Sequence, residues 1–126
     1  MSTGGCEMDR IKFIHHKGAE ILLLDFSDCK ADDVHPLVEQ AKSVIASRPH
    51  RSLLTLANVT NTRFDDSVNQ RMKDFTLHNK PYVRAAAVVG VTGIKKIIFE
   101  AILLFSQRNM QSFDTVERAR DWLISQ

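Results

Sequence analysis

The chain has 126 residues, of which 44% are hydrophobic and 25% are charged, and its formal net charge is +2. This length fits one domain with its own core, and the composition is that of a soluble globular protein, which argues against disorder. Basic residues form no run or patch of the kind that binds nucleic acid, so we expect no nucleic-acid partner. The longest apolar helix is too short to span a bilayer, and residues 1–9 lack the basic and apolar regions of a signal peptide. We therefore expect a flexible leader over residues 1–9 and one cytoplasmic domain over residues 10–126, with no transmembrane segment.

The first half of the chain predicts a β-hairpin, a helix and a third strand. Residues 11–14 and 20–26 have the pattern of two antiparallel strands, joined by a link over residues 15–19. A stripe of apolar residues between positions 34 and 45 predicts a helix. Residues 52–59 predict a third strand, rich in leucine.

The second half predicts two further strand and helix units. A polar loop over residues 60–67 leads into a helix that Pro81 ends. The apolar run from Tyr82 to Val91 fits a strand buried on both faces, and a helical pattern follows from Ile94 to Phe105. A short strand over residues 110–113 and a helix capped by Asp114 complete the chain.

The predicted order is ββαβαβαβα. Repeated β-α units joined by right-handed crossovers give a mainly parallel sheet with helices packed on it. The fold class is therefore α/β, with a five-stranded sheet whose first strand is the antiparallel arm of the N-terminal hairpin.

This order, the polar loop after the third strand and the ending over residues 113–123 resemble the STAS superfamily, and most closely its SpoIIAA-like (STAS/SEC14-like) branch of small bacterial proteins. The resemblance covers residues 10–124. It implies a non-enzymatic switch, an anti-sigma-factor antagonist that binds a kinase-type partner and is turned off by phosphorylation. In that family the phosphorylated serine follows an aspartate, usually within D-S-[ST]-G. Asp66 and Ser67 match this pattern, whereas Val68 and Asn69 replace the second hydroxyl and the glycine.

Ser67 is the first candidate site, for phosphorylation or partner contact, together with Asp66. A helix amino end favours a phosphate, but neighbouring carboxylates repel one. Capping of the helix is the alternative explanation of these residue types. In the preceding loop, Thr60, Thr62 and Arg63 are expected to form a polar rim, and Arg63 could meet an anion; an ordinary surface loop would have the same composition.

Gly90, Thr92 and Gly93 lie where the apolar strand turns into the next helix, at the strand end where open α/β sheets place ligand or partner sites. Their spacing matches neither common nucleotide-binding loop. The backbone freedom of glycine at a tight turn explains both glycines without a ligand.

In the helix that begins at Ile94, one apolar stripe is expected to face the sheet. Its members are Ile94, Ile97, Ile98, Ala101, Ile102 and Phe105. Phe99 and Leu103 then fall on the opposite side. Exposed apolar pairs lower solubility, so either a second copy, a partner or a neighbouring segment is expected to cover them. We predict self-association, as a dimer, through this surface.

Metal, cofactor and catalytic motifs are not found in the sequence. The five histidines lack metal-ligand spacing, and the two cysteines, Cys6 and Cys29, are expected to be reduced thiols. No serine lies in a nucleophile elbow. We therefore predict no enzyme, no metal and no cofactor.

The sequence is compatible with two functions. The first is a STAS-like protein-interaction module that works through loop 60–67, the helix beginning at Asp65 and turn 90–93. The second is a binder of a small apolar or amphipathic ligand, with a pocket lined by Phe75, Phe99 and Leu103. The second requires a concave cavity of roughly 300 Å³ or more.

Overall fold

The computed structural model describes residues 10–106 and 109–126, so the predicted leader and Cys6 lie outside the described residues. The secondary structure has the predicted order. The strands are β1 (Ile11–His16), β2 (Ala19–Asp25), β3 (Leu53–Asn58), β4 (Val83–Val89) and β5 (Met110–Phe113), and the helices are α2 (Ala31–Ala46), α3 (Asp66–Asn79), α4 (Ile94–Ser106) and α5 (Val116–Ile124).

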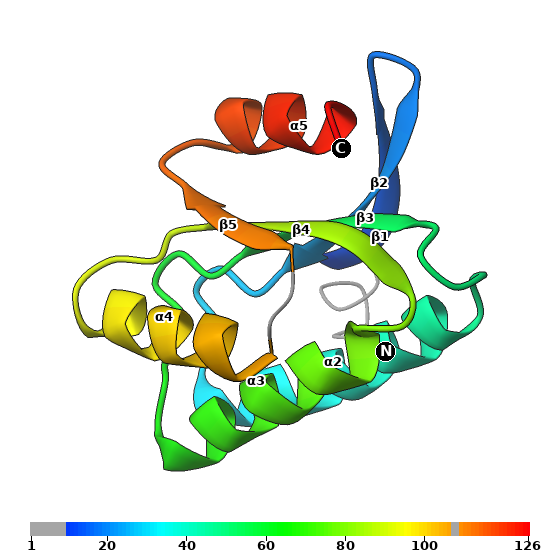
Figure 1. Cartoon of the computed structure of the whole chain (residues 1–126). Coiled ribbons are helices and arrows are strands. Elements are labelled where there is room, and N and C mark those ends of the chain that lie inside the picture. Colours follow the sequence, from blue (N-terminus) through cyan, green and yellow to red (C-terminus); the bar gives the residue numbers. More distant parts are fainter. Residues whose placement is uncertain (1–9, 107–108) are drawn as a thin grey trace.

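The five strands form one sheet in which spatial order equals chain order. β1 runs antiparallel to β2, and β2 to β5 are parallel to one another. Every parallel connection steps in the same direction, so right-handed crossovers place α2, α3 and α4 on one face. α5 follows the last strand and covers the other face (Figure 1). The predicted α/β class, strand number and N-terminal hairpin are confirmed.

The sheet separates two hydrophobic clusters. The larger lies on the face covered by α2, α3 and α4, and it includes the fully buried Val34, Val38 and Val68. The smaller lies beneath α5, where Leu56 and Leu123 are fully buried. Strands with buried side chains on both faces explain the nearly continuous apolar runs of β2 and β4.

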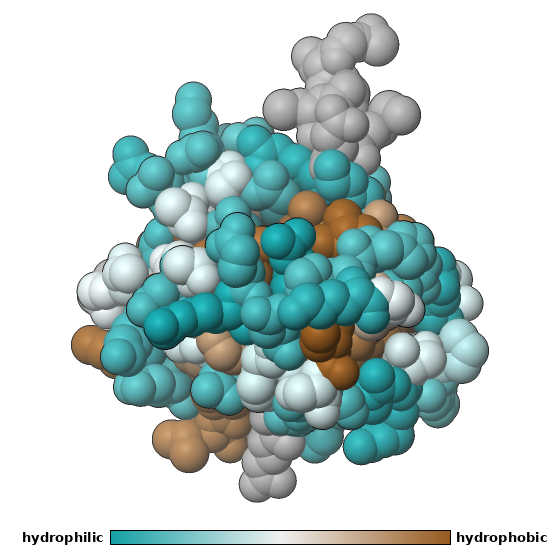
Figure 2. Space-filling view, turned by 90° about the horizontal axis from the view of Figure 1, so that it is seen from above, coloured by the Kyte–Doolittle hydropathy of each residue, from teal (hydrophilic) through white to brown (hydrophobic). Residues whose placement is uncertain are grey.

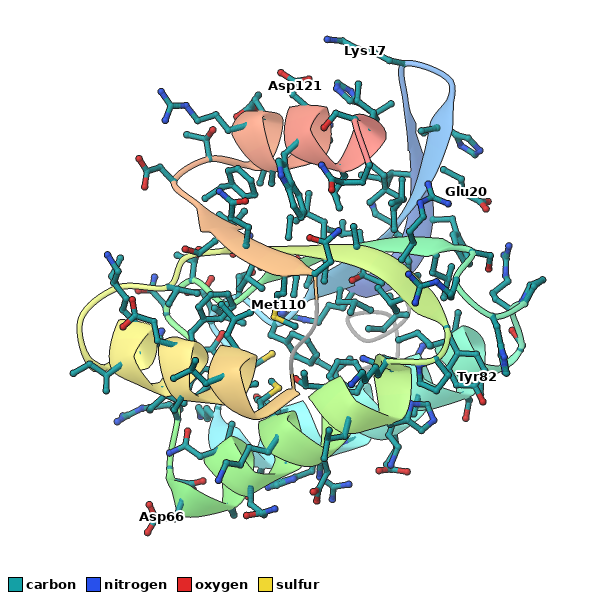
Figure 3. The ribbon with its side chains drawn as sticks, viewed as in Figure 1. Lys17, Glu20, Asp66, Tyr82, Met110 and Asp121 are labelled. Atoms are coloured by element: carbon teal, nitrogen blue, oxygen red, sulfur yellow. The ribbon has the colours of Figure 1, made fainter. Side chains whose placement is uncertain are left out.

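The hairpin turn is shorter than predicted, because only Lys17 and Gly18 separate the strands. Both residues have positive φ (50° and 84°), the geometry that two-residue hairpins require. The turn lies against α5 (Figure 3), where Asp121 Oδ1 is 2.9 Å from His16 Nε2 and 3.3 Å from Lys17 Nζ. These hydrogen bonds, first from His16 and then from Lys17, lower the pKa of Asp121. Around α5 the surface is largely hydrophilic, with smaller hydrophobic patches (Figure 2).

Two local predictions are wrong. The final helix is capped by Thr115, whose hydroxyl accepts the N–H of Arg118 at 3.2 Å, and not by Asp114. In α4, Ile97 is 68% exposed and Ala101 is also exposed, so these two members of the predicted stripe do not face the sheet. Ile98 and Ile102 pack inward as predicted, and Phe99 packs inward with them. The side chains of Ile94 and Phe105 lie outside the described residues.

Candidate functional site

The loops that follow β2, β3 and β4 meet at the carboxyl edge of the sheet. The backbone N–H of Asp28 donates to the carbonyl of Thr60 at 2.9 Å, and the N–H of Val59 donates to Val89 at 2.8 Å. Gly90 packs directly against Thr60. Because the strand order never reverses, this edge lacks the crevice of doubly wound folds. The fold nevertheless brings together two predicted site residues, Thr60 and Gly90.

Thr60 and Thr62 have different environments within this edge. Thr60 is exposed, and its hydroxyl donates to Asn58 Oδ1 at 2.6 Å. Thr62 is only 3% exposed, and its hydroxyl donates to the buried carbonyl of Phe26 at 2.7 Å. The prediction of Thr62 as part of a surface rim is therefore wrong, because this residue ties the loop after β3 to the end of β2.

Arg63 is exposed and lies at an open hollow of about 510 Å³ between the loops after β2 and β3. Asp28 and Asn61 also line it and contact each other, with Asn61 Nδ2 donating to Asp28 Oδ1 at 3.2 Å. Both residues have left-handed backbones, with φ of 61° and 57°. Asparagine and aspartate are the non-glycine residues that adopt this conformation most readily, so a tight turn explains both residue types. Thr92 and Gly93 are exposed, and neither of them lines this hollow.

Ser67 lies at the start of α3 beside the cap of that helix. Asp65 is the N-cap, and its Oδ1 accepts both the N–H of Val68 and the hydroxyl of Ser67, each at 2.8 Å. The bond from Val68 and then the bond from Ser67 lower the pKa of Asp65. Asp66 is the first residue of the helix, and its carboxylate points away from the protein body (Figure 3). The capping explanation of these residues is thus correct for Asp65, and Ser67 remains exposed.

His35 of α2 reaches Ser67 across the helix pair, a contact that the sequence did not reveal. His35 Nε2 is 3.3 Å from Ser67 Oγ, and Arg71 Nε donates to His35 Nδ1 at 3.0 Å. Arg71 also bonds the carboxylate of Glu39. Because Nδ1 accepts from Arg71, the neutral ring carries its proton on Nε2, an assignment that rests on this network. His35 therefore donates to Ser67, and Ser67 donates to Asp65.

The hydrogen-bond directions bear on what Ser67 can do. A nucleophilic serine needs a neighbouring base that accepts its proton. Here the ring nitrogen that faces Ser67 Oγ carries a hydrogen, so His35 is placed as a donor. An oxygen-rich group on Ser67 would lie next to the N–H of His35 and to the carboxylates of Asp65 and Asp66.

Phe99 and Leu103 are half-buried. Phe99 lies in the wall of a cavity between the sheet, α3 and α4, so its predicted outward orientation is wrong. Among the described side chains of α4, the large apolar ones that are exposed are Ile97, at 68%, and Leu104, at 82%. Any surface that α4 offers to a second copy or a partner is therefore centred on Ile97 and Leu104.

The cavity beneath α4 has a volume of about 90 Å³. Phe75 and Phe99 line it as predicted, whereas Leu103 does not. The sheet residues that line it include Ala57 and Ala86, whose short side chains leave the space open. Met110 lies in the same layer, between β5 and α4 (Figure 3). The volume of the cavity is well below the roughly 300 Å³ expected for an ordinary ligand pocket.

Within residues 10–106 and 109–126, no cluster of three or more histidine, cysteine or acidic side chains has the arrangement to hold a metal. Over the same residues, no helix combines the length and hydrophobicity that crossing a bilayer requires.

These observations define an α/β protein with a singly wound mixed sheet and a polar loop edge. No model of a known protein family matches the chain, and no curated protein does either. Among solved structures, the chain is similar to an uncharacterized protein of the DUF3478 family from Shewanella loihica PV-4, described as having a SpoIIAA-like fold. The two share 14% identity with a TM-score of 0.71, over 90% of this chain and 91% of that one. The chain therefore has a SpoIIAA-like fold, as the sequence resemblance predicts.

Proposed function

We propose that this protein is a non-enzymatic regulatory module that binds a protein partner through the carboxyl edge of its sheet. The working surface comprises Thr60, Arg63, turn 90–93 and the start of α3 at Asp66 and Ser67. We propose a kinase-type anti-sigma factor as the partner and the cytoplasm as the compartment, in keeping with the SpoIIAA-like fold.

One observation carries this proposal: the exposed hydroxyl of Ser67 lies between Asp65 Oδ1 and His35 Nε2. A phosphate on Ser67 would remove the proton that Asp65 accepts and would place a dianion beside Asp65 and Asp66, which weakens the start of α3. The N–H of His35 would meet the same phosphate. Modification would therefore alter the edge that the partner contacts, and Ser67 acts as a switch. Since His35 faces Ser67 as a donor, this histidine is not placed to take the proton of the Ser67 hydroxyl.

Crosslinking in the native host, followed by affinity purification, tests the switch. We expect the same partner to be enriched by the wild type and by Ser67→Ala, and to be lost in Ser67→Glu. Ser43→Glu is the matched control, because Ser43 is an exposed serine near the other end of α2. Equal recovery of the partner by Ser67→Glu and the wild type would contradict the proposal, as would phosphopeptide maps in which Ser67 is never modified.

A second function, binding of a small apolar ligand, is favoured by the cavity beneath α4. Its lining is mostly apolar and it includes Phe75 and Phe99. A volume of about 90 Å³ excludes a drug-sized ligand in this conformation, so the ligand would have to be small. Native mass spectrometry of the purified protein tests for a bound molecule, which denaturation should release.

A further inference from the structure

The cavity beneath α4 has one charged group at its wall. Among the described residues that line it, only Lys95 carries a charge. Lys95 is half-buried, and its ammonium donates to the carbonyl of Val59 at 3.1 Å, with the ring of Phe64 5.6 Å away. Burial lowers the pKa of Lys95 because the charged form loses hydration.

Among the described residues, no carboxylate lies within salt-bridge distance of the Lys95 ammonium. Six salt bridges are found within residues 10–106 and 109–126, and Lys95 takes part in none of them. Its hydrogen-bond acceptor is a neutral carbonyl, which compensates a partly desolvated ammonium only in part. A carboxylate placed at the cavity would supply the missing negative charge and a charge-assisted hydrogen bond.

Two of the neutral polar side chains of the cavity wall, Thr76 and Asn79, have hydrogen-bond partners within the protein. The hydroxyl of Thr76 donates to the carbonyl of Met72 at 2.8 Å, and Asn79 Oδ1 is 2.9 Å from His78 Nδ1. Most other lining side chains are apolar, among them Phe75, Ile98 and Ile102. The interior therefore suits a hydrocarbon tail, and Lys95 is where a polar head would bind.

We propose that this cavity binds a short-chain monocarboxylate, with the carboxylate on Lys95 Nζ and the tail between α4 and the sheet. This inference rests on the second function proposed above and names its ligand class. The cavity volume of about 90 Å³ limits the ligand to a short tail. For comparison, one water molecule occupies about 30 Å³ in the liquid. A single ammonium suits one carboxylate, whereas phosphate sites more often combine several donors or an arginine fork.

Titration of the full chain followed by amide NMR tests the proposal, with hexanoate as the probe. Hexan-1-ol has a similar tail without the charge, and acetate has the charge without the tail. We expect hexanoate to shift amides of β3, β4 and α4, and to bind about tenfold or more tightly than either comparison molecule, as hydrogen bonds to charged groups allow.

Lys95→Met removes the charge and keeps an apolar stem of similar length, while Lys96→Met alters the exposed neighbouring lysine as a control. We expect Lys95→Met to lose the preference for hexanoate over hexan-1-ol, and Lys96→Met to retain it. Near-UV circular dichroism checks that both variants are folded. Should Lys95→Met fail to fold, Ala86→Val fills the cavity from the sheet side and should abolish binding of hexanoate with Lys95 still present.

The outcomes distinguish failure of the monocarboxylate inference from failure of the apolar-ligand function. If hexanoate and hexan-1-ol bind equally and Lys95→Met changes neither, the monocarboxylate inference fails and the apolar-ligand function stands. If acetate binds as well as hexanoate, the tail is irrelevant and the cavity is not the site. If none of the three binds to the wild type, the inference and the second proposed function both fail.

Discussion

Gly90 lies so close to Thr60 that a Cβ at position 90 would be 2.5 Å from Thr60 Oγ1 and 2.6 Å from the Thr60 backbone nitrogen. Gly90 also has a φ of 94°, a backbone conformation that residues with a Cβ rarely adopt. A backbone atom cannot move aside as the end of a flexible side chain can. The position therefore requires glycine both for its backbone conformation and for the approach of the neighbouring loop.

We predict that Gly90→Ala destabilises the protein by about 1–3 kcal/mol or more, the cost typical of a strained backbone position. Chemical denaturation monitored by circular dichroism measures this change. Gly93→Asn is the control, because Gly93 has a φ of 59° and no atom within 4 Å of an added Cβ, and asparagine tolerates such a φ. Equal stability of Gly90→Ala and Gly93→Asn would show that the loop after β3 moves away from Gly90 at little cost.

The sequence predicts the elements well because their signals are local. The apolar runs of β2 and β4, and the inward stripe of α3 marked by Val68, Met72 and Phe75, need only neighbouring residues to be recognised. The orientation of α4 could not be predicted in the same way. Apolar residues occupy nearly every side of that helix, from Ile97 to Leu104, so periodicity does not choose one face.

The site was predicted only in part for a related reason. Ser67 and Asp65 are close in sequence, and the helix start could be inferred from their types. His35 and Ser67 are separated by 32 positions, and their contact depends on how α2 and α3 pack. Thr62 is buried directly after the left-handed Asn61, and a sequence of polar residues does not reveal which of them turns inward.

The cap of α3 is predicted to give the protein an acid-sensitive element. The N–H of Val68 and then the hydroxyl of Ser67 hold the pKa of Asp65 below its ordinary value of 3.8. The folded state thus binds this proton less readily than the unfolded state, and the stabilisation by the carboxylate is present above that value. It is lost as the pH falls through the folded-state pKa.

Asp65→Asn keeps a capping residue but removes the titration. We expect the difference in Tm between the wild type and Asp65→Asn to shrink as the pH is lowered from about 5 to about 2.5. Ser67→Ala, which removes one of the two bonds, should reduce the pH-dependent difference without abolishing it. A difference that stays constant over this range would show that Asp65 does not stabilise the folded state through its charge.

The outer side of α4 is predicted to mediate self-association, because Ile97 and Leu104 expose large apolar side chains on it. We expect sedimentation velocity to show a dimer at high protein concentration for the wild type and a monomer for Ile97→Lys/Leu104→Lys. Leu77→Lys is the control, since Leu77 of α3 is 41% exposed and belongs to a different helix. A wild type that sediments as a monomer at every concentration would rule out this dimer.

Two adjacent alanines of β4 offer a matched test of the cavity. Ala86 is 5% exposed and lines the cavity beneath α4, whereas Ala85 is 1% exposed and packs in the cluster beneath α5. A valine at position 86 has open space to fill and suits a strand. We expect Ala86→Val to raise the free energy of unfolding by about 0.5–2 kcal/mol, as cavity-filling substitutions commonly do, and to abolish hexanoate binding.

Ala85→Val is the control, because it adds a side chain to a layer that is already filled, and it should lower the free energy of unfolding by about 1–3 kcal/mol. If denaturation shows the two variants equally destabilised, the space beside Ala86 is closed in solution and offers no room to a tail.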